Sequence, residues 1–203
     1  MKILAVADIH GAQYRLNIVL NNIEKYSPDI LVVCGDITQF GPRDVAKNFL
    51  DQIPIETLAV TGNIDSTDVD IAIDESKAIN LNNKRVDLKG ISFVGINGVD
   101  PNETLLFIKN NKNIVNSKTI LVTHVPPFGF QDKVFIGMHG GSKELRKIID
   151  KYRPRLLLCG HIHEDPGYLK NDGTIVVNCS MGKRGEGALI EINKDIKVEM
   201  LDE

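Results

Sequence analysis

The chain has 203 residues and a net charge of −3, with 42% hydrophobic and 25% charged residues. This composition is ordinary for a globular protein, and the length suits one domain spanning residues 1–203. A slightly acidic chain is not expected to bind nucleic-acid backbones by bulk charge, and no apolar run approaches the roughly 20 residues that span a bilayer. We therefore expect no membrane partner, disfavour nucleic acid, and expect a cytoplasmic protein, because its start lacks a signal-peptide pattern.

The first third of the chain alternates between apolar runs and helical patterns. From Leu16, apolar residues recur at the i, i+3, i+4 and i+7 spacing of an amphipathic helix, which we expect over residues 14–26. A second, shorter helix is expected from Gly41-Pro42 to Leu50. This alternation of strands and helices predicts a parallel sheet with right-handed crossovers. The predicted strands are residues 2–8, 30–36 and 57–63.

The pattern after residue 63 is less regular. A helix capped by Ser66 or Thr67 is expected toward Ala78, and a hairpin over residues 85–98 should turn at Lys89-Gly90. Residues 125–141 are predicted to form a long loop, and such loops are usually functional or disordered. The remaining predicted elements are helices over 102–111 and 142–152, strands over 119–124 and 155–163, and antiparallel strands in the tail from residue 167.

Seven potential metal ligands lie where apolar runs end. Because parallel strands present their carboxyl ends at one edge of a sheet, we expect these side chains to converge on one site. Oxygen and imidazole ligands without a thiolate suit divalent cations such as Mn, Fe, Zn or Mg. The three cysteines are interpreted as buried small hydrophobic residues. The seven residues are Asp8, His10, Asp36, Asn63, His124, His161 and His163.

The spacing within this set favours a two-metal site. Asp8 and His10 are two residues apart, as are His161 and His163, so each pair points to one side of an extended chain. The carboxylate of Asp36 has two oxygens and can bridge two cations. Two cations about 3.5–4 Å apart can hold both the attacking and the leaving oxygen of a displacement at phosphorus, and they lower the pKa of a shared water.

In order along the chain, these motifs resemble the calcineurin-like metallophosphoesterase superfamily. The resemblance covers residues 3 to about 180, and residues 124–132 and 141–164 further resemble small metallophosphoesterase-domain proteins of animals and microbes. It implies a four-layer αββα sandwich of two mixed sheets flanked by helices, with a dinuclear metal site at the strand carboxyl ends. It also implies two divalent metal ions, drawn from Mn, Fe, Zn or Ni. The implied ligands are Asp8, His10, Asp36 and His163 for the first ion, and Asp36, Asn63, His124 and His161 for the second.

One position departs from the family pattern. The family motif reads Gly-Asn-His followed by Asp or Glu, whereas this chain has Gly62-Asn63-Ile64-Asp65. The absent histidine usually steadies the transition state and protonates the leaving oxygen, and such acid–base assistance is worth about 10²–10⁴-fold. His139, in the long loop, is the one histidine outside the seven ligands and therefore the candidate catalytic acid. The alternative is an exposed loop histidine beside a Gly-Gly hinge. We interpret Asp65 as an N-terminal helix residue.

We predict a metal-dependent phosphoesterase that hydrolyses phosphodiesters or activated phosphomonoesters by attack of a metal-bridging hydroxide. The expected substrate is a small phosphoester, with nucleotides among the candidates. The sequence is also compatible with a homo-oligomer. The alternative is a metal-binding scaffold or interaction module with little or no catalysis, because Ile64 replaces the usual acid. Phe128 and Phe130 could line a pocket or anchor the loop, and Lys183-Arg184 could meet a phosphate or form a solvated turn.

Overall fold

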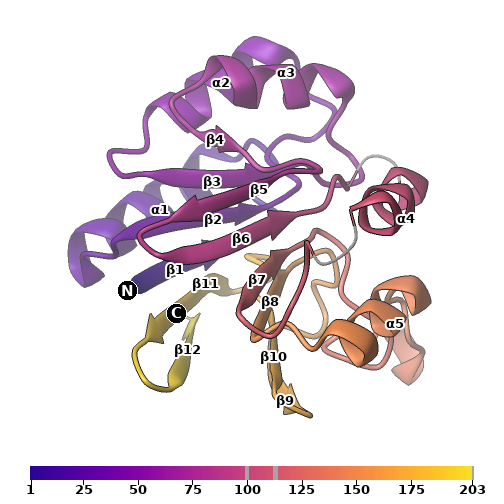
Figure 1. Ribbon diagram of the computed structural model, residues 1–203. Helices are drawn as coiled ribbons and strands as arrows, with labels where there is room; N and C mark the ends of the chain where they lie inside the picture. The colour runs from indigo at the N-terminus through magenta and orange to yellow at the C-terminus, as the bar shows by residue number, and fades with distance from the viewer. Residues whose placement is uncertain (99–100, 112–113, 203) are drawn as a thin grey trace.

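The computed structural model describes residues 1–98, 101–111 and 114–202. Two six-stranded sheets pack face to face and helices cover their outer faces (Figure 1). This is the four-layer αββα sandwich of two mixed sheets that the family resemblance implies. Within the described residues, no helix is both long and apolar enough to cross a membrane.

The first sheet is built from both ends of the chain. Its four N-terminal strands run parallel, with Ile3 paired to Ile30 and Leu31 to Thr57, and two C-terminal strands join antiparallel beside the first strand. In spatial order the strands are β12 (Ile196–Asp202), β11 (Gly185–Ile192), β1 (Lys2–Val6), β2 (Ile30–Cys34), β3 (Thr57–Val60) and β4 (Ile79–Asn80).

The second sheet comes from the middle and the tail of the chain. Its four central strands are parallel and both of its edge strands are antiparallel. In spatial order the strands are β5 (Arg85–Leu88), β6 (Ile91–Gly95), β7 (Thr119–Val122), β8 (Leu156–Cys159), β10 (Thr174–Asn178) and β9 (Gly167–Asn171).

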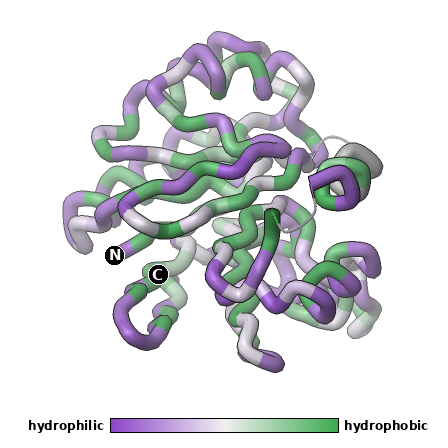
Figure 2. The backbone as a smooth tube through the Cα atoms, in the orientation of Figure 1, coloured by the Kyte–Doolittle hydropathy of each residue, from purple (hydrophilic) through white to green (hydrophobic). Residues whose placement is uncertain are grey.

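Side-chain alternation along the strands produces three hydrophobic layers. In β1, Leu4 packs under the helices of the first sheet, whereas Ile3 packs between the two sheets. A third cluster lies between the second sheet and its helices. In Figure 2 the central strands are largely green and the hairpin turns are purple. The helices are α1 (Gln13–Tyr26), α2 (Arg43–Asp51) and α3 (Thr67–Glu75) on the first sheet, and α4 (Pro101–Asn110) and α5 (Lys143–Tyr152) on the second.

Most predicted elements are confirmed, with two differences. The hairpin turns at Lys89-Gly90, and the Ser142 hydroxyl accepts a hydrogen bond from the Leu145 amide at the start of α5. The helix expected toward Ala78 ends at Glu75 and is followed by the unpredicted strand β4. The tail is not one antiparallel unit, because β10 pairs in parallel with β8 in the second sheet while β11 and β12 join the first.

The two sheets are joined at the edge where the parallel strands end. The amide of Ala7, just past β1, donates to the Cys179 carbonyl at 3.2 Å, and the Met181 amide donates back to the Ala7 carbonyl at 3.0 Å. The Gly160 amide, after β8, donates to the His124 carbonyl at 2.9 Å. The ends of β1, β7, β8 and β10 are therefore held in one network, which places the strand-end residues of both sheets beside one another.

Candidate metal centre

The backbone turns sharply at several predicted ligands. Asp8, His10, Asp36 and His161 have φ values of 63°, 55°, 51° and 71°. Non-glycine residues in this left-handed region are uncommon, and such strained conformations cluster at functional sites. At these positions the chain leaves the strand direction and the side chains gather at the sheet edge.

Three glycines are packed directly against the predicted ligands. A Cβ atom on Gly62 would lie 2.0 Å from the Asp36 Oδ1 atom, and one on Gly160 would lie 2.8 Å from the Asp8 Oδ2 atom. A Cβ atom on Gly35 would lie 2.7 Å from the His124 Nδ1 atom. Each glycine therefore leaves space that the side chain of a predicted ligand occupies, which explains the glycines that precede Asp36, Asn63 and His161 at the strand ends.

One half of the cluster, here called the His124 half, contains Asp36, Asn63 and His124. The Nδ1 atom of His124 lies 2.9 Å from the Cys34 carbonyl oxygen, which can only accept, so this nitrogen carries the proton and donates. The Nε2 atom then faces the Asn63 Oδ1 atom at 2.9 Å and the Asp36 Oδ2 atom at 3.3 Å. Three electron-rich atoms thus converge in a site where His124 is only 1% exposed.

The protonation of His124 reflects this convergence. Burial would lower its pKa, but the hydrogen bond to Asp36 and the negative charges of Asp8 and Asp36 outweigh burial and raise the pKa to about 9. Without a metal, a proton on the Nε2 atom therefore occupies the position between the three electron-rich atoms. The same position suits a cation.

The other half, here called the His163 half, contains Asp8, His10 and His163. The His163 Nε2 atom lies 3.3 Å from the Asp8 Oδ1 atom and 3.5 Å from the His10 Nε2 atom. Burial raises the pKa of Asp8, but the hydrogen bond with His163 and the nearby charge of His124 lower it to about 2. The buried Nδ1 atom of His10 has no hydrogen-bond partner in the described part of the chain.

His161 connects the two halves. Its amide donates to the Asp8 Oδ2 atom at 3.0 Å, and its ring lies 5.0 Å from the His124 ring, centroid to centroid. A continuous series of contacts thus joins all seven predicted residues. Two groups of three, Asp8/His10/His163 and Asp8/Asp36/His124, have donor atoms within 4.8 Å of one another. The oxygen and imidazole atoms of these groups, with no thiolate among them, fit divalent cations.

Asp65 has a role that the sequence did not reveal. It lies before α3, is 3% exposed, and does not act as an N-terminal helix residue. Its Oδ2 atom accepts from the Ile37 and Gly62 amides at 3.0 and 2.9 Å, and its Oδ1 atom accepts from the Thr38 amide at 2.9 Å. Burial raises its pKa against the lowering effect of these bonds. Asp65 therefore ties the segment after Asp36 to the segment that contains Asn63.

Arg15 is a second residue that the sequence did not single out. From the first turn of α1 its guanidinium donates to the Asp8 carbonyl oxygen, while its buried Nε atom has no partner among the described residues. Its charge contributes to lowering the pKa of His10, behind burial, and it opposes the rise in the pKa of His163 caused by the Asp8 hydrogen bond. Arg15 therefore places a fixed positive charge beside the His163 half.

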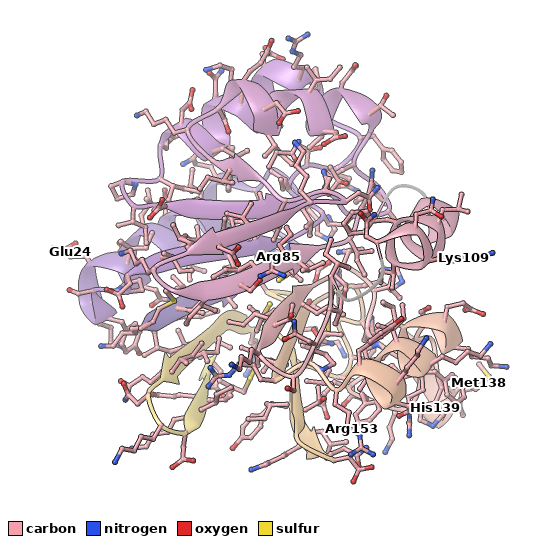
Figure 3. The ribbon with its side chains drawn as sticks, in the orientation of Figure 1. Glu24, Arg85, Lys109, Met138, His139 and Arg153 are labelled. Carbon is pink, nitrogen blue, oxygen red and sulfur yellow. The ribbon has the colours of Figure 1, made fainter. Side chains whose placement is uncertain are left out.

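His139 is not brought into contact with the seven-residue cluster. Its Nδ1 atom lies 2.7 Å from the Oδ1 atom of the buried Asp132, and its ring lies 5.0 Å from the Phe128 ring. Figure 3 shows His139 beside Met138 at the outer margin of the molecule near α5.

Phe130 is 2% exposed and anchors the loop. Ile64 donates its amide to the Asp36 Oδ1 atom at 3.2 Å and offers no proton donor in its side chain.

A cavity of about 440 Å³ borders the His163 half. Its lining includes His163, Gly182 and Met200, together with the Lys183-Arg184 pair. Both basic side chains are exposed. The turn that carries them is therefore solvated and also forms one wall of the cavity.

Comparisons with known proteins agree with this fold. A family model described as calcineurin-like phosphoesterase matches residues 1–165. An uncharacterized protein of Methanocaldococcus jannaschii is 37% identical over 204 residues, covering 89% of this chain and 88% of that protein. A probable glycerophosphodiester phosphodiesterase of Arcobacter nitrofigilis is 25% identical over 222 residues, covering 97% and 77%. The structure of a dimetal phosphatase from Danio rerio has the same fold, with a TM-score of 0.70 at 11% identity, covering 98% and 95%.

Proposed function

Because the chain belongs to the calcineurin-like phosphoesterase family, we propose that it hydrolyses phosphoesters at a centre of two divalent metal ions. Asp8, His10, Asp36 and His163 would hold one ion, and Asp36, Asn63, His124 and His161 the other. The observation that carries the proposal is the series of contacts that joins all seven residues. The pairing of the histidine rings, His10 with His163 and His124 with His161, supports this division of the ligands.

The protein residues prepare the centre for this chemistry. Bound divalent cations would polarise the phosphoryl oxygens and lower the pKa of a coordinated water. The Cys34 carbonyl fixes the His124 tautomer, so that the Nε2 atom presents its lone pair once the proton there is displaced. The low pKa of Asp8 keeps it a carboxylate at neutral pH. Because its carboxylate has two oxygens, Asp36 could bind both ions.

We propose phosphodiesters or activated monoesters as the substrate class. Ile64 cannot protonate a leaving oxygen, which favours substrates whose leaving group departs as a stable anion. The relative named as a probable glycerophosphodiester phosphodiesterase supports the diester class. We also propose His139 as the proton donor for poorer leaving groups. Asp132 orients its Nδ1 atom, as a carboxylate does for a catalytic histidine, and the side chain is 36% exposed.

Hydrolysis of bis(p-nitrophenyl) phosphate and p-nitrophenyl phosphate by the Mn²⁺-loaded protein tests the proposal. We expect turnover with a preference for the diester, and a loss of roughly 10³-fold or more in Asp36→Asn, because that residue serves both ions. Metal content of both proteins, measured by elemental analysis, separates lost binding from lost catalysis. A metal-loaded wild-type protein with no turnover on either ester would favour the alternative, a metal-binding scaffold.

The same assay tests His139 separately. His139→Ala should reduce turnover of alkyl esters about 10²-fold while leaving p-nitrophenyl esters nearly unchanged, since nitrophenolate needs no proton to depart. Phe128→Leu is a matched control, because it removes the ring contact and keeps the imidazole. Equal losses on both kinds of ester would remove His139 from the catalytic role.

A further inference from the structure

The segment Lys133–His139 forms a short finger with a firmly held base. Lys133 and His139 pair as an antiparallel bridge, and the Val134 amide donates to the Met138 carbonyl at 2.8 Å. At the base, the Asp132 Oδ2 atom accepts from the Gly129 and Gly141 amides, each at 3.0 Å. The loop that the sequence predicted as functional or disordered is therefore an ordered projection with the 3₁₀ turn η1 (Phe135–Gly137) at its end.

Three large apolar side chains at this end are exposed to solvent. Phe135 is 75% exposed, Ile136 is 94% exposed and Met138 is 60% exposed, and we call these three residues the apolar tip. Ile136 also has a φ of 63°, an unfavourable conformation for a β-branched residue. Single exposed apolar residues are common, but a contiguous group usually marks a contact surface. The finger thus maintains a strained and exposed conformation that presents apolar surface outward.

Helix α5 places a row of positive charges next to the finger. Lys143, Lys147 and Lys151 are spaced by four residues, so they lie along one face of the helix, and all three are exposed; we call them the lysine stripe. Within the described residues, none of the three has a carboxylate partner within 4.0 Å; the ion pair inside α5 joins Arg146 to Asp150.

The lysine stripe and the apolar tip belong to one surface. The Lys143 Nζ atom lies 5.5 Å from the centroid of the Phe128 ring, and the His139 ring at the base of the finger lies 5.0 Å from the same ring. Figure 3 shows Met138 and His139 beside α5. Residues 132–155 contain seven lysines and arginines against three acidic residues, in a chain whose net charge is −3. Positive charge is therefore concentrated where the apolar tip projects.

We propose that the apolar tip and the lysine stripe form a docking surface for a membrane with anionic lipid headgroups. Apolar side chains that insert shallowly, beside lysines that reach the headgroups, are the two features that bind proteins to such a surface. A nucleic acid or an acidic protein would use the lysines but would leave the tip exposed. The sequence led us to expect no membrane partner because it has no spanning segment, but surface docking requires none. The proposal is independent of the metal centre.

Co-sedimentation of the metal-loaded protein with phosphatidylcholine vesicles, with and without phosphatidylglycerol, tests the proposal. We expect binding to the anionic vesicles that weakens as salt is raised, and little binding to phosphatidylcholine alone. Replacing the lysine stripe (K143Q, K147Q and K151Q) should weaken binding about 100-fold, since each lysine near an anionic surface contributes roughly fivefold. Replacing the tip (F135S, I136S and M138S) should weaken it about 10-fold or more.

Matched controls keep the test decisive. Phe40→Ser removes an apolar side chain that is 74% exposed elsewhere, and Lys25→Gln removes a surface charge from α1; both should bind like the wild type. All replaced side chains at the tip and the stripe are exposed, so thermal unfolding midpoints should stay unchanged. Absence of binding to anionic vesicles overturns the proposal, as does binding that the tip variant retains. If the wild-type protein did not bind vesicles but formed a dimer, and only the tip variant lost that dimer, the surface would instead bind a second copy of the chain.

Discussion

The two halves of the candidate metal centre are held in different ways. In the His124 half, His124 is 1% exposed and is fixed by the Cys34 carbonyl on one side and by Asn63 and Asp36 on the other. In the His163 half, the His163 side chain is 35% exposed, and the His10 Nδ1 atom has no partner in the described part of the chain. The histidine of the first half is buried and held by protein groups, whereas the two histidines of the second half are only partly buried around the fully buried Asp8.

The difference predicts that the two histidines contribute unequally to the stability of the metal-free protein. Buried and mutually bonded polar groups contribute strongly to stability, because removing one member leaves the others unpaired. Half-exposed groups can exchange protein partners for water at little cost. The His124 side chain should therefore act as part of the folded core, whereas His163 should contribute less to the stability of the metal-free protein.

The largest expected effect comes from removing one histidine from each half. His124→Ala should lower the free energy of unfolding of the metal-free protein by about 3–5 kcal/mol, because it creates a cavity and removes the ring that bonds the Cys34 carbonyl and the Asp36 Oδ2 atom. His163→Ala should lower it by only about 1–2 kcal/mol, because the His163 side chain is 35% exposed and the Asp8 carboxylate keeps its hydrogen bond from the His161 amide. Urea unfolding in the presence of a chelator measures both values. Similar losses in the two variants would show that the halves are not distinct.

The sequence predicted the members of both halves but not this difference. The seven candidate ligands were recognisable because each follows a local apolar run, and parallel strands must present their ends at one edge. Burial depends on the partners that surround each side chain, and these come from distant segments. Cys34, which fixes His124, is 90 residues away along the chain. The candidate ligands could therefore be predicted from the local sequence, whereas the hydrogen bonds that hold them could not.

Asp65 and the finger show the same limit. From the local sequence, an aspartate just before a helix is predicted to be a helix-terminal residue. In the structure, Asp65 is instead a buried acceptor of hydrogen bonds from the Ile37, Thr38 and Gly62 amides, and these distant contacts cannot be predicted from the residues around it. Likewise, the run from Val134 to Met138 is apolar, and a local pattern does not distinguish an anchored loop from an exposed tip. The four-layer fold was predicted by family resemblance, but the short strand β4 was missed because two residues give no measurable periodicity.

A second prediction concerns the bracing by Asp65. Asp65→Asn replaces one acceptor oxygen with a donor and leaves buried amides unsatisfied, so the free energy of unfolding should fall by about 2–4 kcal/mol. Because the segments carrying Asp36 and Asn63 would loosen, Mn²⁺ affinity should fall about 10–100-fold. Chemical unfolding and calorimetric titration measure the two effects.

Asp68→Asn is the matched control for Asp65. Asp68 lies exposed in the first turn of α3 and should change stability by less than about 1 kcal/mol. If the two variants behaved alike, Asp65 would be no more than a helix-terminal residue, and the bracing of the His124 half would lose its main support.

The smallest expected effect is a pH dependence of stability in the metal-free protein. The pKa of His124 is raised from 6.5 to about 9 in the folded protein, so its stabilising contribution is complete below pH 6.5 and is lost as the pH rises through 9. The pKa of Asp8 is lowered from 3.8 to about 2, so its contribution is present above pH 3.8 and is lost as the pH falls through 2. The metal-free protein should therefore be most stable between about pH 4 and pH 6.5.

A divalent cation should abolish the alkaline loss of stability, because it replaces the proton between His124, Asp36 and Asn63. Thermal unfolding of the metal-free protein should show a decline of roughly 1–2 kcal/mol between pH 6.5 and pH 9, less than the full shift implies, since Asp8 and Asp36 readjust as the proton leaves. With Mn²⁺ bound the decline should disappear, and in His124→Ala it should be absent with or without metal. A decline that persists in the metal-loaded protein would place the titrating group elsewhere, because a proton and a cation cannot share the His124 Nε2 lone pair.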